Sequence, residues 1–237
     1  MSDLDALIAD LVIANRILGR EGVCDAFGHI SVRHPDRPDR FLLSCSRSPE
    51  FVQADDIMVF EPDGSPVDAR GRQPYLERFI HCAIFEARPD VQSIVHNHAP
   101  GVIPYSVTQT PLRPIQHTFA RIGADIPVWD IHDRFGDTNM LVSDVAQGRD
   151  LAACLADNVV VLMRGHGCTV TAPSIAEAVL TSIYLQVNAQ LQMDAMRLGD
   201  VTYLTPGEIE ASSQINQPKS GSVRAWEYLK ARTNQEA

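Results

Sequence analysis

The stretch Ile94-Val95-His96-Asn97-His98 decides how this chain of 237 residues is interpreted. It is a short apolar run, typical of a strand, that ends in two histidines two residues apart. On a strand, residues i and i+2 point to the same face with their Cα atoms roughly 6.5–7 Å apart. Two imidazoles placed in this way can bind one metal ion, although two histidines can also simply end a strand at the surface.

A third histidine strengthens the metal interpretation. Residues 159–163 form a second apolar run, and His166 follows it in the sequence Arg164-Gly165-His166-Gly167. Three neutral imidazoles with one open position are a common arrangement for a catalytic divalent metal. The sequence therefore predicts that His96, His98 and His166 bind a metal together.

The composition limits the class of protein. With 45% hydrophobic residues the chain is long enough to bury a large core, and one domain is expected. The formal net charge is -10 and no basic stripe is present, so a nucleic-acid partner is not expected. No apolar run approaches the ~20 residues that span a bilayer, so no membrane is expected. The five cysteines are scattered without a Cys-x-x-Cys pair, which favours reduced thiols and a cytoplasmic location.

Helical and strand periodicities alternate along the chain. The expected helices cover residues 3–20, 74–88, 100–109, 144–155 and 173–198, followed by shorter pieces near 205 and 223–229. The expected strands cover residues 30–33, 41–44, 57–60, 91–95, 126–131 and 159–163. A turn at Pro62-Asp63-Gly64 suggests a hairpin, and hairpins imply antiparallel pairing. We therefore expect a mixed sheet covered by helices on both faces.

Several polar residues beyond the three histidines are candidates for a site. His29 and Ser31 flank the start of the strand at 30–33, although His29 alone is more typical of a hydrogen-bonded structural histidine than of a site residue. The loop from Ser44 to residue 49 holds one cation, Arg47, and is compatible with either an anion site or a solvated turn. Glu77 falls in a first helical turn, where it either complements the helix dipole or transfers protons with a pKa raised by burial.

Together these motifs resemble the class II aldolase/adducin family, whose metal-dependent members include L-fuculose-phosphate aldolase and L-ribulose-phosphate 4-epimerase. The resemblance runs from about residue 7 to residue 200. Five motifs carry it: Phe27-Gly-His-Ile-Ser-Val-Arg33, Glu77-Arg-Phe-Ile-His81, Arg88-Pro-Asp90 with Val95-His-Asn-His-Ala99, Arg164-Gly-His-Gly167, and Ser174-Ile-Ala-Glu-Ala178.

The resemblance has consequences for both site and fold. It implies that His96, His98 and His166 bind one divalent ion per subunit, Mn²⁺ or Zn²⁺, and that Glu77 is the acid/base and in some members a further ligand. It implies an α/β fold, an αβα sandwich with a mixed, largely antiparallel central sheet. It also implies a homotetramer with sites at subunit interfaces. Residues 1–237 would form a single domain, with residues 200–237 as a C-terminal helical extension.

The chain departs from the phosphate-binding aldolases at three places. His29 stands in a turn where they have Asn, the loop Ser46-Arg47-Ser48-Pro49 replaces a Thr-Pro-Thr-Gly-like loop, and Tyr75-Leu76 replaces a Ser-Ser pair. Small hydroxyls that would hold a phosphate are lost, which favours a flatter substrate whose carboxylate faces Arg47 and His29. The chain is similar in this respect to the family's decarboxylases of dihydroxyphthalate and of hydroxymethylpyridine dicarboxylate.

The expected function is therefore a metal-dependent decarboxylase of a hydroxylated aromatic or pyridine carboxylate. Glu77 is the expected catalytic residue, and the expected substrate-binding residues are His29, Ser31, Ser44, Arg47, Tyr75 and His117. Two alternatives remain open at this point. One is an aldolase, epimerase or dehydratase that acts on a sugar phosphate or ketoacid, and the other is a non-enzymatic binding module like the adducin branch.

Overall fold

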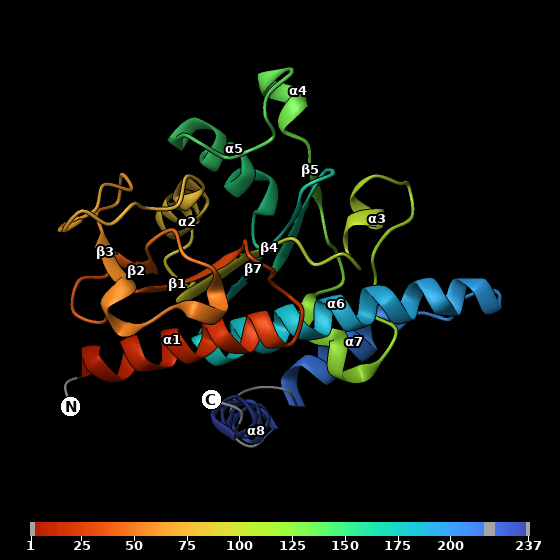
Figure 1. Ribbon diagram of the computed structural model, residues 1–237. Helices are drawn as coiled ribbons and strands as arrows, with labels where there is room; N and C mark the ends of the chain where they lie inside the picture. The colour runs from red at the N-terminus through yellow and green to blue at the C-terminus, as the bar shows by residue number, and fades with distance from the viewer. Residues whose placement is uncertain (1–2, 216–220, 236–237) are drawn as a thin grey trace.

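A seven-stranded sheet runs through the centre of the protein (Figure 1). The computed structural model describes residues 3–215 and 221–235. The strand order is β3-β2-β1-β4-β7-β6-β5, and every neighbouring pair is antiparallel except β5 and β6. The strands are β1 (His29–Arg33), β2 (Phe41–Ser44), β3 (Ile57–Phe60), β4 (Ser93–Asn97), β5 (Val128–Trp129), β6 (Val160–Met163) and β7 (Gly167–Ala172). The predicted mixed, largely antiparallel sheet is confirmed.

Helices cover both faces of this sheet, which confirms the predicted αβα sandwich (Figure 1). One layer contains α1 (Asp3–Arg20), α6 (Ile175–Leu198) and α8 (Gly221–Gln235). The other layer contains α2 (Arg78–Ala87), α4 (Ile131–Phe135) and α5 (Val145–Leu155). The remaining helices are α3 (Ile103–Ser106), α7 (Pro206–Ile215) and the short 3-10 helices η1 (Pro49–Phe51), η2 (Ala54–Asp56) and η3 (His117–Ile122).

Successive side chains along a strand point to opposite faces of the sheet, and they contribute to two separate hydrophobic cores. In β6, Val160 and Leu162 pack with α1 and α6, whereas Val161 and Met163 pack with α2 and α5. This is the two-residue period of a strand that is buried on both faces. In β4, Ile94 belongs to the core under α2. His96 therefore emerges on the α2 side of the sheet, because it lies two residues further along the same strand.

The observed elements differ from the expected ones at several points. The first helix has its predicted bounds, but α2 begins at Arg78 rather than Pro74, because Pro74 pairs with Cys45 in an isolated β-bridge. The strand expected at 126–131 is only two residues long. The side chain of Asp130 accepts a hydrogen bond from the backbone of His132 and so starts α4 there. Strand β7 was not predicted at all.

The predicted C-terminal extension at 200–237 contains α7 and α8. Helix α8 packs against α1 and α6, and α7 packs against η3. Residues 216–220 and 236–237 lie outside the described part of the chain. Over the two described ranges, we find no helix with the length and apolar character needed to cross a membrane.

Candidate metal and substrate site

Four side chains from three separate parts of the chain converge on one point. Glu77, His96, His98 and His166 each place a ligand atom within 4.8 Å of the others. Nε2 of His98 lies 3.1 Å from Nε2 of His96 and 3.1 Å from Nε2 of His166. Oε2 of Glu77 lies 3.5 Å from Nε2 of both His96 and His166. We call this group the ligand cluster.

Backbone carbonyls orient two of the imidazoles. Nδ1 of His96 lies 3.1 Å from the carbonyl oxygen of Cys168, and Nδ1 of His166 lies 2.9 Å from that of Met140. A carbonyl oxygen only accepts, so each ring carries its proton on Nδ1 and presents the lone pair of Nε2 to the centre of the cluster. These lone pairs and the Glu77 carboxylate face one point and would repel one another there. The donor set fits a divalent cation at that point, with three nitrogens and one oxygen as ligands.

Glycines allow the strand ends to approach closely enough to form this cluster. At Gly167, the first residue of β7, an added Cβ would lie 2.2 Å from the carbonyl oxygen of Asn97. At Gly28, which has φ +94°, an added Cβ would lie 3.1 Å from the carbonyl oxygen of His96. Gly28 and Gly167 therefore each let two strand ends approach more closely than a residue with a side chain would allow.

Glu77 has a different position from the one expected. It immediately precedes α2, but its side chain makes no hydrogen bond that caps the helix. Its Oε1 accepts a hydrogen bond of 3.0 Å from the backbone N–H of Val142, which leaves Oε2 facing the histidines. Burial raises the pKa of this carboxyl, but the imidazoles of His96 and His166, when they carry a proton on Nε2, outweigh burial and lower its pKa below the ordinary range. The group is therefore a carboxylate at neutral pH, and the expectation of a raised pKa was wrong.

One loop between α4 and α5 orients two members of the cluster, and sequence reasoning missed it. Met140 supplies the carbonyl that binds His166, and Val142 supplies the N–H that binds Glu77. Met140 has φ +66°, an uncommon conformation for a residue with a side chain. Asp137-Thr138-Asn139 contains turn-forming residues, which indicate a turn in the sequence but not the partners of its backbone groups.

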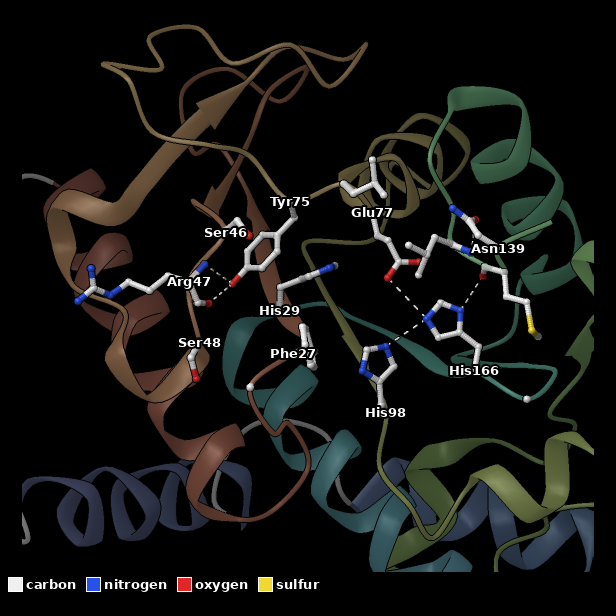
Figure 2. A pocket seen from close by; sticks show the side chains of 16 residues that line it. Phe27, His29, Ser46, Arg47, Ser48, Tyr75, Glu77, His98, Asn139 and His166 are labelled. Atoms are coloured by element: carbon white, nitrogen blue, oxygen red, sulfur yellow. Dashed lines mark hydrogen bonds and ion pairs between the residues drawn. The ribbon is translucent and has the colours of Figure 1, made fainter.

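A pocket with a volume of about 720 Å³ opens beside the cluster (Figure 2). Glu77, His98 and His166 line it, whereas His96 lies beneath them and is fully buried. Much of the remaining lining is apolar or aromatic. The other lining residues are Ala26, Phe27, Gly28, His29, Ser46, Arg47, Ser48, Tyr75, Leu76, Asn139, Met140, Leu141 and Gly165. Phe27 is 66% exposed and Leu76 is 49% exposed, so apolar surface is available to a ligand.

Of the predicted substrate-binding residues, three line the pocket. They are His29, Tyr75 and Arg47, and the rings of His29 and Tyr75 pack with their centroids 4.5 Å apart. Ser31 and Ser44 are fully buried behind this wall and do not line the pocket. They contact lining residues or the neighbours of lining residues instead. Ser44 donates a 3.3 Å hydrogen bond to the Tyr75 hydroxyl, and Ser31 contacts His81.

The guanidinium of Arg47 points away from the cluster (Figure 2). Its Nε donates a 2.7 Å hydrogen bond to the carbonyl of Phe51 and lies 3.3 Å from Oδ2 of Asp56. The Tyr75 hydroxyl donates to the carbonyl of Arg47 and accepts a 3.3 Å hydrogen bond from its backbone N–H. The backbone of this loop therefore faces the pocket, and the expected contact of Arg47 with a substrate requires its side chain to turn.

His117 is not brought to this pocket within one chain. It is exposed at the start of η3, which packs against α6 and α7. Its predicted role in substrate binding stays a prediction, as does the predicted homotetramer with sites at subunit interfaces.

Comparison with known proteins places these features in a family. Residues 9–193 match the Class II Aldolase and Adducin N-terminal domain. Decarboxylase tropJ of Talaromyces stipitatus is 36% identical over 234 residues, which cover 89% of this chain and 87% of that protein. A 3,4-dihydroxyphthalate decarboxylase of Arthrobacter keyseri is 29% identical over 237 residues, covering 94% of this chain and 92% of that protein.

A solved structure of an aldolase II superfamily protein from Pseudomonas syringae has the same fold, with a TM-score of 0.82 at 21% identity. The match covers 100% of this chain and 96% of that one. The resemblance that the motifs predicted is thus confirmed over most of the chain. The chain belongs to the class II aldolase and adducin family and is similar to its decarboxylase branch.

Proposed function

We propose that this protein is a divalent-metal-dependent decarboxylase of a hydroxylated aromatic or pyridine carboxylate. The observation that carries the proposal is the ligand cluster at one side of a pocket whose other walls are largely apolar and aromatic. Among the described residues that line this pocket, Arg47 is the one Lys or Arg, and its guanidinium is turned away. A flat ring suits the apolar and aromatic part of these walls, whereas a phosphate would find, among the described lining residues, no Lys or Arg side chain turned toward the cluster. The relatives named as decarboxylases support the same choice.

His96, His98 and His166 would hold Mn²⁺ or Zn²⁺, since imidazole nitrogens suit both metals. The bound ion would supply positive charge that stabilises negative charge on the substrate's ring hydroxyl and neighbouring carboxylate. Glu77 is close enough to serve as a fourth ligand or to remain free for proton transfer.

Glu77 would move the proton. Its Oε2, fixed by the Val142 hydrogen bond to Oε1, takes the proton of the ring hydroxyl and delivers it to the ring carbon that bears the carboxylate. The carbon–carbon bond then breaks, carbon dioxide leaves, and the electron pair of that bond returns through the ring to the oxygen. A proton from water restores the hydroxyl, so one proton is consumed for each carbon dioxide released.

The test is the release of carbon dioxide. Metal-loaded protein is incubated with hydroxylated phthalates and pyridine dicarboxylates, beside a sample stripped of metal by a chelator. We expect release from at least one of these acids, and only in the metal-loaded sample. Absence of release from the whole panel would contradict the proposal.

The same cluster would also serve an aldolase, epimerase or dehydratase that acts on a sugar phosphate or ketoacid. Binding of a phosphate compound would distinguish this alternative from the proposed decarboxylase. A ligand that binds the folded state raises its thermal stability, so dihydroxyacetone phosphate or phosphoglycolate should protect such an enzyme. Protection by these phosphates, but not by aromatic diacids, would favour the alternative.

A further inference from the structure

Three polar side chains form a hydrogen-bonded chain that runs from the pocket wall into the interior, and none of them belongs to the ligand cluster. Oγ of Ser31 lies 2.6 Å from Nδ1 of His81, and Nε2 of His81 lies 2.7 Å from Nδ1 of His29. Ser31 and His29 are two residues apart on β1, so they face the same side of the sheet, and His81 reaches down to both from α2. Ser31 and His81 are fully buried, whereas His29 lines the pocket.

The protons of this chain can be arranged in two ways. In the first, Nδ1–H of His29 donates to His81, and Nδ1–H of His81 donates to Ser31. The Ser31 hydroxyl would then need another acceptor, but its Oγ has no second partner among the residues that the structure describes. A buried donor without an acceptor is unfavourable, which argues against this arrangement.

In the second arrangement, every buried donor has an acceptor. The Ser31 hydroxyl donates to Nδ1 of His81, and Nε2–H of His81 donates to Nδ1 of His29. The remaining proton of His29 is then on Nε2, for which the described residues offer no partner. Burial lowers the pKa of His81 to about 3, so this ring is neutral and holds one proton, as the arrangement requires.

We propose that Ser31 and His81 hold His29 in the Nε2–H tautomer, so that His29 offers a neutral N–H donor to a carboxylate of the substrate. Ser31 and His81 are positioning residues in this scheme, and His29 contacts the substrate. Figure 2 shows His29 beside Tyr75, on the side of the pocket across from His166. The choice of a carboxylate rests on the proposed function, whereas the tautomer follows from the hydrogen-bond chain alone.

The tautomer is tested directly by nuclear magnetic resonance of protein with isotope-labelled histidine, both metal-free and loaded with Zn²⁺. A His29→Gln variant assigns the signals of His29 by their disappearance. We expect the proton of His29 on Nε2 in the wild-type protein, and a mixture of tautomers in Ser31→Ala. A wild-type proton on Nδ1 would overturn the proposal.

The role of the His29 N–H donor is tested by measuring how tightly two probes bind the Zn²⁺-loaded protein. The probes, 2,3-dihydroxybenzoate and catechol, differ by one carboxylate. Ser31→Ala should weaken binding of the benzoate by about three- to tenfold, the size of one hydrogen bond, and should leave binding of catechol nearly unchanged. Ser31→Thr keeps a hydroxyl and should restore the affinity. A general structural defect would weaken both probes equally, and that result would contradict the proposed role.

Ser93→Ala is the matched control. Ser93 is also fully buried, and its hydroxyl donates a 2.8 Å hydrogen bond to the backbone carbonyl of Ser31 without touching either histidine of the chain. We expect this variant to lose stability like Ser31→Ala but to keep the wild-type preference for the benzoate. If neither probe binds the wild-type protein, both the proposed function and the role of His29 as a donor to a carboxylate are contradicted. The tautomer measurement still shows whether Ser31 and His81 hold the proton of His29 on Nε2.

Discussion

The two sides of the pocket are built in different ways (Figure 2). On the ligand side, His96, His166 and Glu77 each have a backbone partner that fixes the orientation of the side chain. On the loop side, Arg47 contributes mainly its backbone, which the Tyr75 hydroxyl holds, while its guanidinium turns outward. The side chains of the ligand side are therefore held in one orientation. On the loop side, the guanidinium of Arg47 is free to take another orientation when a substrate binds.

The difference follows from the elements that carry each side. His96 is directly paired with His29 in the register of β1 and β4, and His166 lies in the turn that connects β6 to β7. Strand pairing fixes such positions, because a slip by one residue would turn every side chain to the other face. Arg47 lies in a loop between β2 and η1, where no comparable register constrains its side chain.

The largest effects should follow from loss of a metal ligand. His96→Ala, His98→Ala and His166→Ala should each lose the bound metal and reduce carbon dioxide release to background, because three imidazoles form the binding site. The fold should survive, since none of the three histidines belongs to either hydrophobic core. Elemental analysis, the decarboxylase assay and thermal unfolding check these three outcomes.

His132→Ala is the control for these variants, because it removes an exposed histidine that does not line the pocket. It should keep the wild-type metal content. A variant of His96, His98 or His166 that also keeps its metal would remove that residue from the proposed site.

The next largest effect is expected for Glu77→Gln. The amide retains the shape of the side chain and can still accept the hydrogen bond of Val142, but it cannot transfer the proton. General acid–base catalysis typically contributes ~10²–10⁴-fold, so turnover should fall by about that factor with a modest change in substrate affinity. Metal content should stay near that of the wild type. Near-normal turnover would exclude Glu77 as the proton carrier, and loss of the metal would identify it as an essential ligand.

A smaller effect is expected for Tyr75→Phe, on the loop side. The change removes the hydroxyl that contacts Ser44 and both backbone groups of Arg47, and keeps the ring that packs on His29. The free energy of unfolding should fall by about 0.5–1.5 kcal/mol, as for the loss of a hydrogen bond. Denaturant unfolding measures this, and metal analysis should show no change. A loss of metal in Tyr75→Phe would mean that the two sides of the pocket are not independent.

The smallest effect is expected for Arg47→Ala. The sequence predicted a charge-assisted contact between Arg47 and a substrate carboxylate. Loss of such a contact would cost roughly 1.5–3 kcal/mol of binding free energy. The observed side chain instead forms a partly exposed ion pair with Asp56, and such pairs contribute about 0–1 kcal/mol to stability. We therefore expect substrate affinity to fall by less than about fivefold in an equilibrium binding assay. A loss of tenfold or more would show that the guanidinium turns toward the bound substrate.

The sequence was most informative where a short motif determines geometry. The spacing of His96 and His98 and the glycines around His166 predicted a cluster that the structure brings together within 4.8 Å. The bounds of α1 were also predicted, because its apolar residues recur at helical spacing over 18 residues.

Other features depend on contacts that are distant in the sequence. Strand β7 was missed although Cys168, Val170 and Ala172 alternate with threonines, a pattern typical of a strand. Its pairing with β4 and β6 stabilises it as a strand. The bonds of Met140 and Val142 to the cluster involve backbone groups, which every residue type possesses. The lowered pKa of Glu77 likewise depends on imidazoles that the fold brings beside it.

In the proposed mechanism, decarboxylation requires one divalent ion held by His96, His98 and His166. The most direct measurement adds Mn²⁺ or Zn²⁺ stepwise to chelator-stripped protein and records bound metal and carbon dioxide release in the same samples. We expect both quantities to rise together and to reach a plateau at one ion per chain in the wild-type protein, and neither to rise in His98→Ala. Carbon dioxide release that is independent of added metal, or unchanged in His98→Ala, would contradict a requirement for the ion.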